Sequence, residues 1–331
     1  MISTHRRSAL KAGLAASAIW ASGLHGARAQ ALPDTARILV GFPPGGAPDT
    51  IARRLAEQLT GKLANAVVVD NRPGAGGRIA LDVARQSPSD GLTLLLNPAG
   101  LLTINPHSYA KLNYDPFKDM APISLAAWID FGFGVGPGVP AEVRNIADFA
   151  AWAKANLGRV SFGSPAAGAP PHFVGDALSR NLGLGMTHVA YRGATPALTD
   201  LIGGQISALV LTLGDLVQNA RAGKLRLLAS TGPARSRFAP ETATFTEQKV
   251  PGLEMRDWFG VYVAGTASTE TVARLAPVVR AALDAPKYVQ ALAGSSLEAA
   301  SSTPQELDRL AHADLERWRP IVKASGFVAD S

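Results

Sequence analysis

The 331-residue chain contains no cysteine. This absence excludes disulfides, thiolate nucleophiles, Cys-ligated zinc, iron–sulfur clusters and a lipid-modified N-terminal cysteine. Aromatic residues make up only 6% and charged residues only 18% of the chain, whereas hydrophobic residues make up 47%. Because a disordered chain has the opposite balance, this composition predicts a folded protein with room for two ordinary domains.

The chain also lacks a basic surface stripe, although its net charge is +6. Four basic residues, Arg6, Arg7, Lys11 and Arg28, lie in the first 29 residues, which contain no acid. Without these four, the 32 basic and 26 acidic side chains become 28 and 26, and they are scattered along the chain. Nucleic acid is therefore not an expected partner.

The N-terminus has the pattern of an export signal. A positive segment ending at Lys11 precedes a short apolar run, 12–24, and the small-x-small triplet Ala27-Arg28-Ala29. We therefore predict a signal peptide over residues 1–29, cleavage near Ala29 and a periplasmic location. The Arg6-Arg7 pair is typical of twin-arginine signals and also occurs in general secretory signals, so both routes stay open. No later apolar run has the length of a membrane span.

Short apolar strands alternate with helices, a pattern that predicts an α/β fold with mostly parallel sheets. The predicted strands are 37–40, 67–69, 92–96, 160–163, 206–213 and 225–230. The predicted helices are 48–63, 79–85, 170–181, 215–222 and a C-terminal helix that starts at the capping box Thr303-Pro304-Gln305-Glu306 and extends to Lys323. We expect the C-terminal helix to pack back on the first of two α/β units.

Two glycine-rich or small-residue loops connect a strand to a helix, at 42–49 and at 163–172. The N-terminus of a helix presents unsatisfied amides and the positive end of the helix dipole, so such a loop can hold an anion without an arginine. A tight turn, with Asp49 complementing the helix dipole, explains the first loop equally well. Pro170 and Pro171 lack N–H groups, so the second helix offers fewer donors than usual.

Catalytic and metal-binding motifs are missing. Ser164 lies in Gly163-Ser164-Pro165, which is not a nucleophile elbow, and the histidines lack metalloprotease spacing. His172 is interpreted as a hydrogen-bonding residue of a first helical turn, and Trp258 as a core residue. We expect no catalytic residue, no metal and no cofactor.

Taken together, the mature chain resembles the Bug family, the exported solute receptors of tripartite tricarboxylate transporters. The matching stretches follow the family order through nearly the whole mature chain: GFPPGGAPD (41–49), VVVDNRPGAGG (67–77), DGLTLLL (90–96), INP (104–106), YDPFKDMAPIS (114–124), FGSPAAG (162–168), MTHVAYRGATPALTDLIGGQ (186–205), AGKLRLLA (222–229), WFGVYV (258–263) and STPQEL (302–307).

The resemblance implies a two-lobed periplasmic-binding-protein fold, similar to type II, in which each lobe is a mostly parallel sheet flanked by helices. Lobe one would comprise residues 32–127 and 259–331, and lobe two residues 128–258. The resemblance also implies a monomer that binds a small carboxylate between the lobes and delivers it to membrane transporter subunits. The implied ligand-binding residues come from the two loops and one strand end: Phe42, Gly45, Gly46, Ala47, Pro48, Asp49, Ser164, Gly168, Ala169, Pro170, His172 and Thr212.

This chain departs from the family pattern at several of these positions. Pro48 stands where Thr or Ser is usual, and Leu211-Thr212 replaces a frequent Asp-Asn pair. Serines are usual in the second loop, where this chain has Ala169, Pro170 and Pro171. Each change removes a polar contact, so we expect a ligand with an apolar body. Two alternatives to transport stay open: a ligand-sensing receptor for signalling, and an exported α/β hydrolase, which the missing nucleophile–base motif disfavours.

Overall fold

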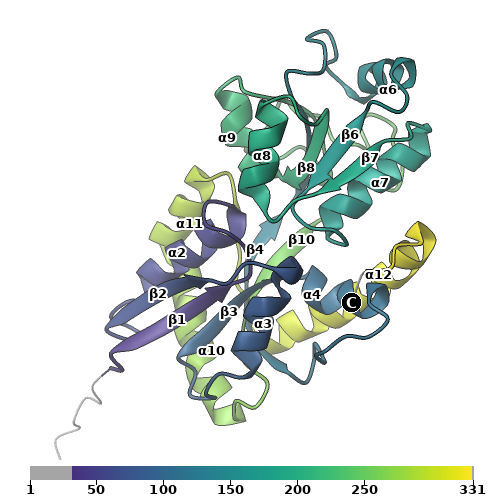
Figure 1. Ribbon diagram of the computed structural model, residues 1–331. Coiled ribbons are helices and arrows are strands. Elements are labelled where there is room, and N and C mark those ends of the chain that lie inside the picture. Colours follow the sequence, from purple (N-terminus) through teal and green to yellow (C-terminus); the bar gives the residue numbers. More distant parts are fainter. Residues whose placement is uncertain (1–31, 330–331) are drawn as a thin grey trace, which may run out of the picture. The chain divides into compact units, whose positions relative to one another are not determined.

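The computed structural model describes residues 32–329, so the predicted signal peptide and its cleavage site lie outside the described residues. The strands of the described part form two sheets (Figure 1). The first is six-stranded, in the order β11-β4-β10-β3-β1-β2. Its strands are β1 (Thr35–Val40), β2 (Ala66–Asn71), β3 (Thr93–Pro98), β4 (Met120–Ile129), β10 (Asp257–Ala264) and β11 (Glu298–Ala299).

Helices cover both faces of the first sheet. They are α2 (Ala47–Leu59), α3 (Arg78–Arg85), α4 (Gly100–Thr103), α5 (Asn105–Ser108), α10 (Thr269–Leu283), α11 (Pro286–Gly294) and α12 (Pro304–Ser325), with a 3₁₀ turn at Ala75–Gly77. Leu39 and Leu95 pack in one cluster with α3, α4 and α12, whereas their neighbours Ile38 and Leu94 pack in another with α2, α10 and α11. Strand β3 carries a continuous apolar run because its successive side chains face opposite, equally buried sides of the sheet.

The second sheet is five-stranded, in the order β7-β6-β8-β5-β9. It consists of β5 (Phe131–Val135), β6 (Ser161–Ser164), β7 (Thr187–Ala190), β8 (Ala208–Thr212) and β9 (Arg226–Ser230). Its helices are α6 (Ile146–Ala155), α7 (Pro170–Leu182), α8 (Ala194–Ile202) and α9 (Leu213–Arg221). Along β8, Leu209 and Leu211 pack in the cluster that contains α8 and α9 residues, whereas Ala208 and Val210 pack in the cluster that contains α6 and α7 residues.

Most strands of each sheet run in one direction, as predicted. In the first sheet β1 is parallel to β2 and β3, while β10 is antiparallel to both β3 and β4. In the second sheet β6 is parallel to β7 and β8, while β5 is antiparallel to β8 and β9. The exceptions include β5 and β10, the first strand that the chain forms after each passage from one sheet to the other.

The chain passes from the first sheet to the second between β4 and β5, at Asp130, and returns between β9 and β10. Figure 1 shows β4 and β10 side by side where the two sheets meet. Backbone hydrogen bonds stabilise this region: the Leu213 amide donates to the Asp130 carbonyl, and the Thr231 amide donates to the Phe131 carbonyl. The exact lobe boundaries, 127/128 and 258/259, stay predictions.

Two helix boundaries show where the sequence pattern was wrong and where it was confirmed. The first helix ends at Leu59 rather than Leu63, because Thr60 leaves the helical conformation and Gly61 adopts φ +75°. The C-terminal helix has the predicted capping box at Thr303 and Glu306 and packs against β4 of the first sheet. Within residues 32–329, no helix combines the length and apolarity needed to cross a membrane.

Candidate functional site

A cavity lies between the two sheets. Its volume is about 90 Å³, and because one water needs about 10–15 Å³ on the same measure, it has room for on the order of six to nine atoms of that size. The residues that line it come from both sheets: Phe42, Pro43, Gly46, Pro48, Gly76, Pro98, Gly100, Leu101, Asn105, Tyr109, Ile129, Phe131, Pro165, Ala166, Ala167, Gly168, Ala169, Pro170, Pro171, Ala194, Leu211, Thr212, Asp215, Asp257 and Phe259.

The lining is mostly apolar and contains no lysine, arginine or histidine. Its polar side chains are those of Asn105, Tyr109, Thr212, Asp215 and Asp257. An anionic ligand would therefore depend on backbone amides and helix dipoles rather than on a basic side chain.

Four helices begin at this cavity without a side-chain cap. Lining residues stand in or next to the first turns of α2, α7, α8 and α9, and none of these helices has an N-cap side chain bonded to its amides. The first amide of α2, that of Ala47, donates instead to the side-chain carboxylate of Asp215. In contrast α6, α10 and α12, which start elsewhere, are capped by Asn145, Ser268 and Thr303. An uncapped start alone does not mark a site, since α11 is uncapped too. What distinguishes the four helices is that their positive ends converge on one cavity.

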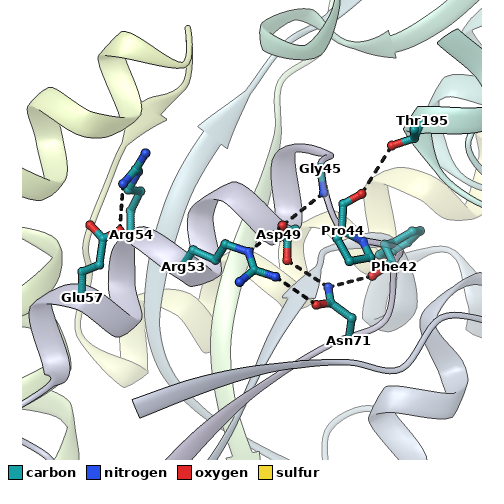
Figure 2. A network of polar contacts seen from close by, with 9 residues as sticks. All are labelled: Phe42, Pro44, Gly45, Asp49, Arg53, Arg54, Glu57, Asn71 and Thr195. Carbon is teal, nitrogen blue, oxygen red and sulfur yellow. Dashed lines mark hydrogen bonds and ion pairs between the residues drawn. The ribbon is translucent and has the colours of Figure 1, made fainter. Parts of the chain in front are cut away.

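The loop before α2 is held by the carboxylate of Asp49, which is only 4% exposed. Its Oδ2 accepts hydrogen bonds from the Gly45 amide (3.1 Å) and Arg53 Nε (2.9 Å), and its Oδ1 accepts one from Asn71 Nδ2 (3.0 Å). Asn71 Nδ2 also donates to the Phe42 carbonyl, at 3.0 Å, and Figure 2 shows these groups gathered around Asp49. Asp49 thus fixes the conformation of the loop, and it does not line the cavity.

Burial by itself would raise the pKa of Asp49. The hydrogen bonds from Arg53, Asn71 and the Gly45 amide outweigh burial, so the pKa lies below its ordinary value. The carboxylate therefore stays ionised and keeps all its donors at neutral pH. Gly45 has φ +97°, which a residue with a Cβ adopts only with strain, whereas Gly46 is extended, with φ −89°.

The loop before α7 is held by a different network. The Ser164 hydroxyl donates to the Ala166 carbonyl (3.0 Å), so His188 Nε2, 2.7 Å away, is the donor to Ser164 Oγ. The Gly168 amide donates to Nδ1 of His172 (3.1 Å), and the rings of His172 and His188 stack at 3.8 Å between centroids. Burial lowers the pKa of both histidines, that of His188 to about 3. Both rings are therefore neutral at physiological pH.

The two prolines limit what α7 offers, as expected from the sequence. Pro170 and Pro171 occupy the first two positions of α7 and have no N–H. The next amide, of His172, already donates to the Ala169 carbonyl at 2.9 Å. The donor supply on this side of the cavity is accordingly smaller than at an ordinary helix start.

The two lobes touch each other around the cavity. Thr195 Oγ1 donates to the Pro44 carbonyl at 3.4 Å (Figure 2). A Cβ added to Gly46 would lie 3.3 Å from the Cβ of Ala194, and one added to Gly193 only 2.8 Å from Cδ of Pro43. The structure is therefore a closed arrangement in which glycines permit close approach of the lobes.

Of the twelve predicted site residues, the structure brings seven to the cavity wall: Phe42, Gly46, Pro48, Gly168, Ala169, Pro170 and Thr212. The other five, Gly45, Ala47, Asp49, Ser164 and His172, do not line it. Gly45, Asp49, Ser164 and His172 belong to the two supporting networks. The backbone amide of Ala47 donates a hydrogen bond to the side-chain carboxylate of Asp215 across the lobes. Direct contact with a ligand stays a prediction for all twelve.

The sequence reasoning missed the two acids in the cavity wall, Asp215 and Asp257. Burial raises the pKa of each to about 7, only partly offset by hydrogen bonds from the amides of Ala47 and Trp258, respectively. In the sequence Asp257 stands directly before the apolar run 258–263, and Asp215 is the first residue of the predicted helix 215–222. An acid at the first residue of an otherwise fully apolar strand was the available signal.

The Ser164–His188 pair has the spacing of a nucleophile and its base but not the setting. Ser164 is fully buried, its proton is donated to Ala166, and it does not line the cavity. In residues 32–329 no group of three or more histidine, aspartate or glutamate side chains could hold a metal ion.

Two lobes around a cleft, each built on a mostly parallel sheet and linked by strand crossings, define the periplasmic-binding-protein class. The model of the tripartite tricarboxylate transporter family receptor matches residues 51–327. This chain belongs to that receptor family.

Relatives and solved structures agree with this assignment. The chain is 33% identical over 287 residues to the "UPF0065 protein in tcbD-tcbE intergenic region" of Pseudomonas sp. strain P51, covering 86% of this chain and 84% of the relative. It is 28% identical to protein BugT of Bordetella pertussis, covering 88% of this chain and 89% of BugT.

The solved structure of R. palustris Rpa4515 with adipate is 28% identical with a TM-score of 0.84, covering 89% of this chain and 98% of that structure. The periplasmic binding protein BugD is 26% identical with a TM-score of 0.83, covering 90% and 99%. MatC of Rhodopseudomonas palustris with bound malate is 25% identical with a TM-score of 0.78, covering 87% and 99%.

Proposed function

We propose that this protein is an extracytoplasmic receptor that binds a small carboxylate between its two lobes and delivers it to the membrane subunits of a tripartite tricarboxylate transporter. The observation that carries the proposal is the convergence of four helix starts without N-cap side chains on a cavity without a basic side chain. One amide of these four starts, that of Ala47 in α2, is occupied by the carboxylate of Asp215. Such a cavity attracts an anion through backbone amides and helix dipoles. The adipate and malate bound to the two solved relatives support a carboxylate as the anion.

The cavity supports a ligand with an apolar body. Pro48, Ala169, Pro170 and Leu211, where we expected polar contacts to be lost, all line it. Aromatic and aliphatic side chains, including Phe42, complete the wall. We therefore expect branched or aromatic carboxylates to bind more tightly than citrate.

Binding is proposed to proceed by closure of lobe one (32–127 and 259–331) on lobe two (128–258). A ligand that touches loop 42–49 and loop 163–172 contacts both lobes only when they are closed. It therefore binds the closed state more tightly and shifts the population toward it. The close approach of Gly46 to Ala194 is consistent with such a closed state.

The remaining parts of the proposal concern location, assembly and chemistry. We infer that the signal peptide is removed near Ala29 and that the mature protein acts in the periplasm as a monomer. We also infer that it performs no catalysis, a view supported by the buried position of Ser164 away from the cavity wall. Turnover assays on ester and amide panels test this last point.

Native mass spectrometry of freshly purified protein is the experiment that tests the function. We expect a bound mass that corresponds to a small carboxylate and disappears on partial unfolding and refolding. Calorimetry with carboxylates, starting with adipate and malate, then measures affinity. If no carboxylate is retained and none binds, the receptor proposal is wrong.

A further inference from the structure

Asp257 is a buried acceptor that the protein leaves unsatisfied. It is the first residue of β10, its side chain is 1% exposed, and its Oδ1 has no hydrogen-bond partner within residues 32–329. Asp257 nevertheless lines the cavity, as does Phe259, two residues along the same strand face. Buried polar atoms are normally paired, so an unpaired oxygen at a cavity wall indicates that a ligand atom completes it.

The neighbouring buried acid is, in contrast, satisfied by the protein itself. Trp258 points to the opposite face of β10, where its Nε1 donates to Oδ2 of Asp314 at 2.7 Å. Oδ1 of Asp314 accepts from Arg317 Nε at 2.9 Å. On the core side of the strand Trp258 thus meets a carboxylate, Asp314 of α12, that has a partner at both oxygens, whereas on the cavity side Asp257 has an oxygen, Oδ1, without a partner. Asp314 is therefore a reference for Asp257.

The charge balance of the cavity points to the type of ligand. Asp257 and Asp215 both line it, and no cationic side chain does. A dicarboxylate would add two negative charges beside these two acids, whereas an ammonium group would compensate one of them. Among the groups packed near Asp257, Asp314 raises its pKa, while Arg317 and the Trp258 amide lower it; burial dominates. A cation at Oδ1 would favour the ionised form.

We propose that Asp257 determines specificity by accepting a hydrogen bond from an ammonium group, so that the ligand is an amino carboxylate. Its carboxylate faces the uncapped helix starts, its carbon body contacts the apolar wall, and its ammonium group lies on Oδ1 of Asp257. This inference rests on the proposed receptor function and adds the chemistry of the ligand's second end.

Sets of probes with one carbon skeleton and different ends test this directly. Each set pairs a carboxylate with an amine, a methyl or a second carboxylate: 6-aminohexanoate, hexanoate and adipate form one set. A second, aromatic set is 4-(aminomethyl)benzoate, 4-methylbenzoate and terephthalate. Affinities are measured by calorimetry on the full mature protein near pH 8, where Asp257 is ionised, and are repeated near pH 6.

In the wild type we expect the amine of at least one set to bind at least about tenfold more tightly than both of its partners. Its affinity should rise from pH 6 to pH 8 as Asp257 loses its proton. Asp257→Asn keeps the shape but removes the charge, so it should weaken amine binding at least about tenfold and leave methyl probes within about threefold. Asp314→Asn removes a buried carboxylate outside the cavity and should preserve the wild-type ranking.

Several results would overturn the assignment. One such result is that dicarboxylates bind more tightly than amines and that dicarboxylate affinity falls as the pH rises. Asp257 would then act as a protonated hydrogen-bond donor. The assignment is also contradicted if Asp257→Asn ranks the probes by affinity as the wild type does, or if no amine of either set binds. In these cases the receptor function survives as long as some carboxylate binds. If Asp257→Asn does not fold, the wild-type ranking and its pH dependence still decide the question.

Discussion

Gly46 is the position where a single added side chain should prevent closure. Its backbone is extended, with φ −89°, so valine is compatible with the local conformation. In the closed structure a Cβ at this position lies 3.3 Å from the Cβ of Ala194 on the other lobe, and two further methyl groups must find room beside it. Overpacking of this kind costs about 1–3 kcal/mol, which corresponds to roughly 5–150-fold in affinity.

We expect a graded series in which Gly46→Ala weakens binding slightly and Gly46→Val weakens it by the larger factor. The unliganded protein should melt at nearly the wild-type temperature, because the clash exists only when the lobes close. Calorimetry with the tightest-binding carboxylate measures affinity, and small-angle scattering with and without it measures compaction.

The matched control is Gly138→Val. Gly138 is exposed, its backbone φ is not positive, and the nearest atom to an added Cβ is the Gly204 carbonyl oxygen at 3.8 Å. Wild-type affinity in Gly46→Val, or an equal loss in Gly138→Val, would refute the reasoning. Ligand binding by the wild type without compaction would refute closure itself.

Four further predictions concern stability and processing. In urea unfolding, Asp49→Ala should destabilise the protein by about 3 kcal/mol, because it leaves several buried donors without an acceptor. Asp70→Ala breaks only an exposed ion pair and should cost under about 1 kcal/mol. Folding raises the pKa of Asp257 from 3.8 to about 7, so ionisation of this carboxyl should lower the free energy of unfolding by up to about 4 kcal/mol as the pH rises from 3.8 to 7. Asp257→Asn should remove this part of the dependence of stability on pH. The pKa of His188 is lowered from 6.5 to about 3, so stability should fall by up to about 5 kcal/mol as pH drops through that window, and His188→Gln should resist acid better. N-terminal sequencing of exported protein should begin after Ala29, and an intact Met1 in a membrane fraction would contradict processing.

Local sequence patterns were sufficient for the elements that carry their own signals. The glycine-rich loop before α2, the capping box at Thr303 and Glu306 and the apolar run of β3 are each specified by neighbouring residues. β4 and β5 were not assigned as separate strands, because residues 120–135 show no turn signal strong enough to mark the passage between sheets at Asp130.

The same holds for the candidate site: some of its residues follow from local sequence patterns and others do not. Loop residues such as Gly46 and Ala169 follow from the strand–loop–helix pattern, since a parallel sheet places the starts of its helices at one edge. Gly45 and Asp49 belong to the same loop, yet their contacts turn the Asp49 carboxylate inward, a direction that the spacing cannot predict.

The two α/β units, the two loops and the family could be predicted from the amino-acid sequence, because short-range periodicity, glycine placement and capping are local properties. Three features depend on the packing of the whole chain: α8 and α9 also start at the cavity, the Asp215 carboxylate accepts from the Ala47 amide, and Oδ1 of Asp257 has no hydrogen-bond partner within residues 32–329. Asp215 and Asp257 are 42 positions apart in the chain, and both line the cavity because β10 returns to the first sheet while α9 belongs to the second lobe. Burial, pKa and unpaired hydrogen bonds depend on what the rest of the fold places around a residue, and no local pattern contains that information.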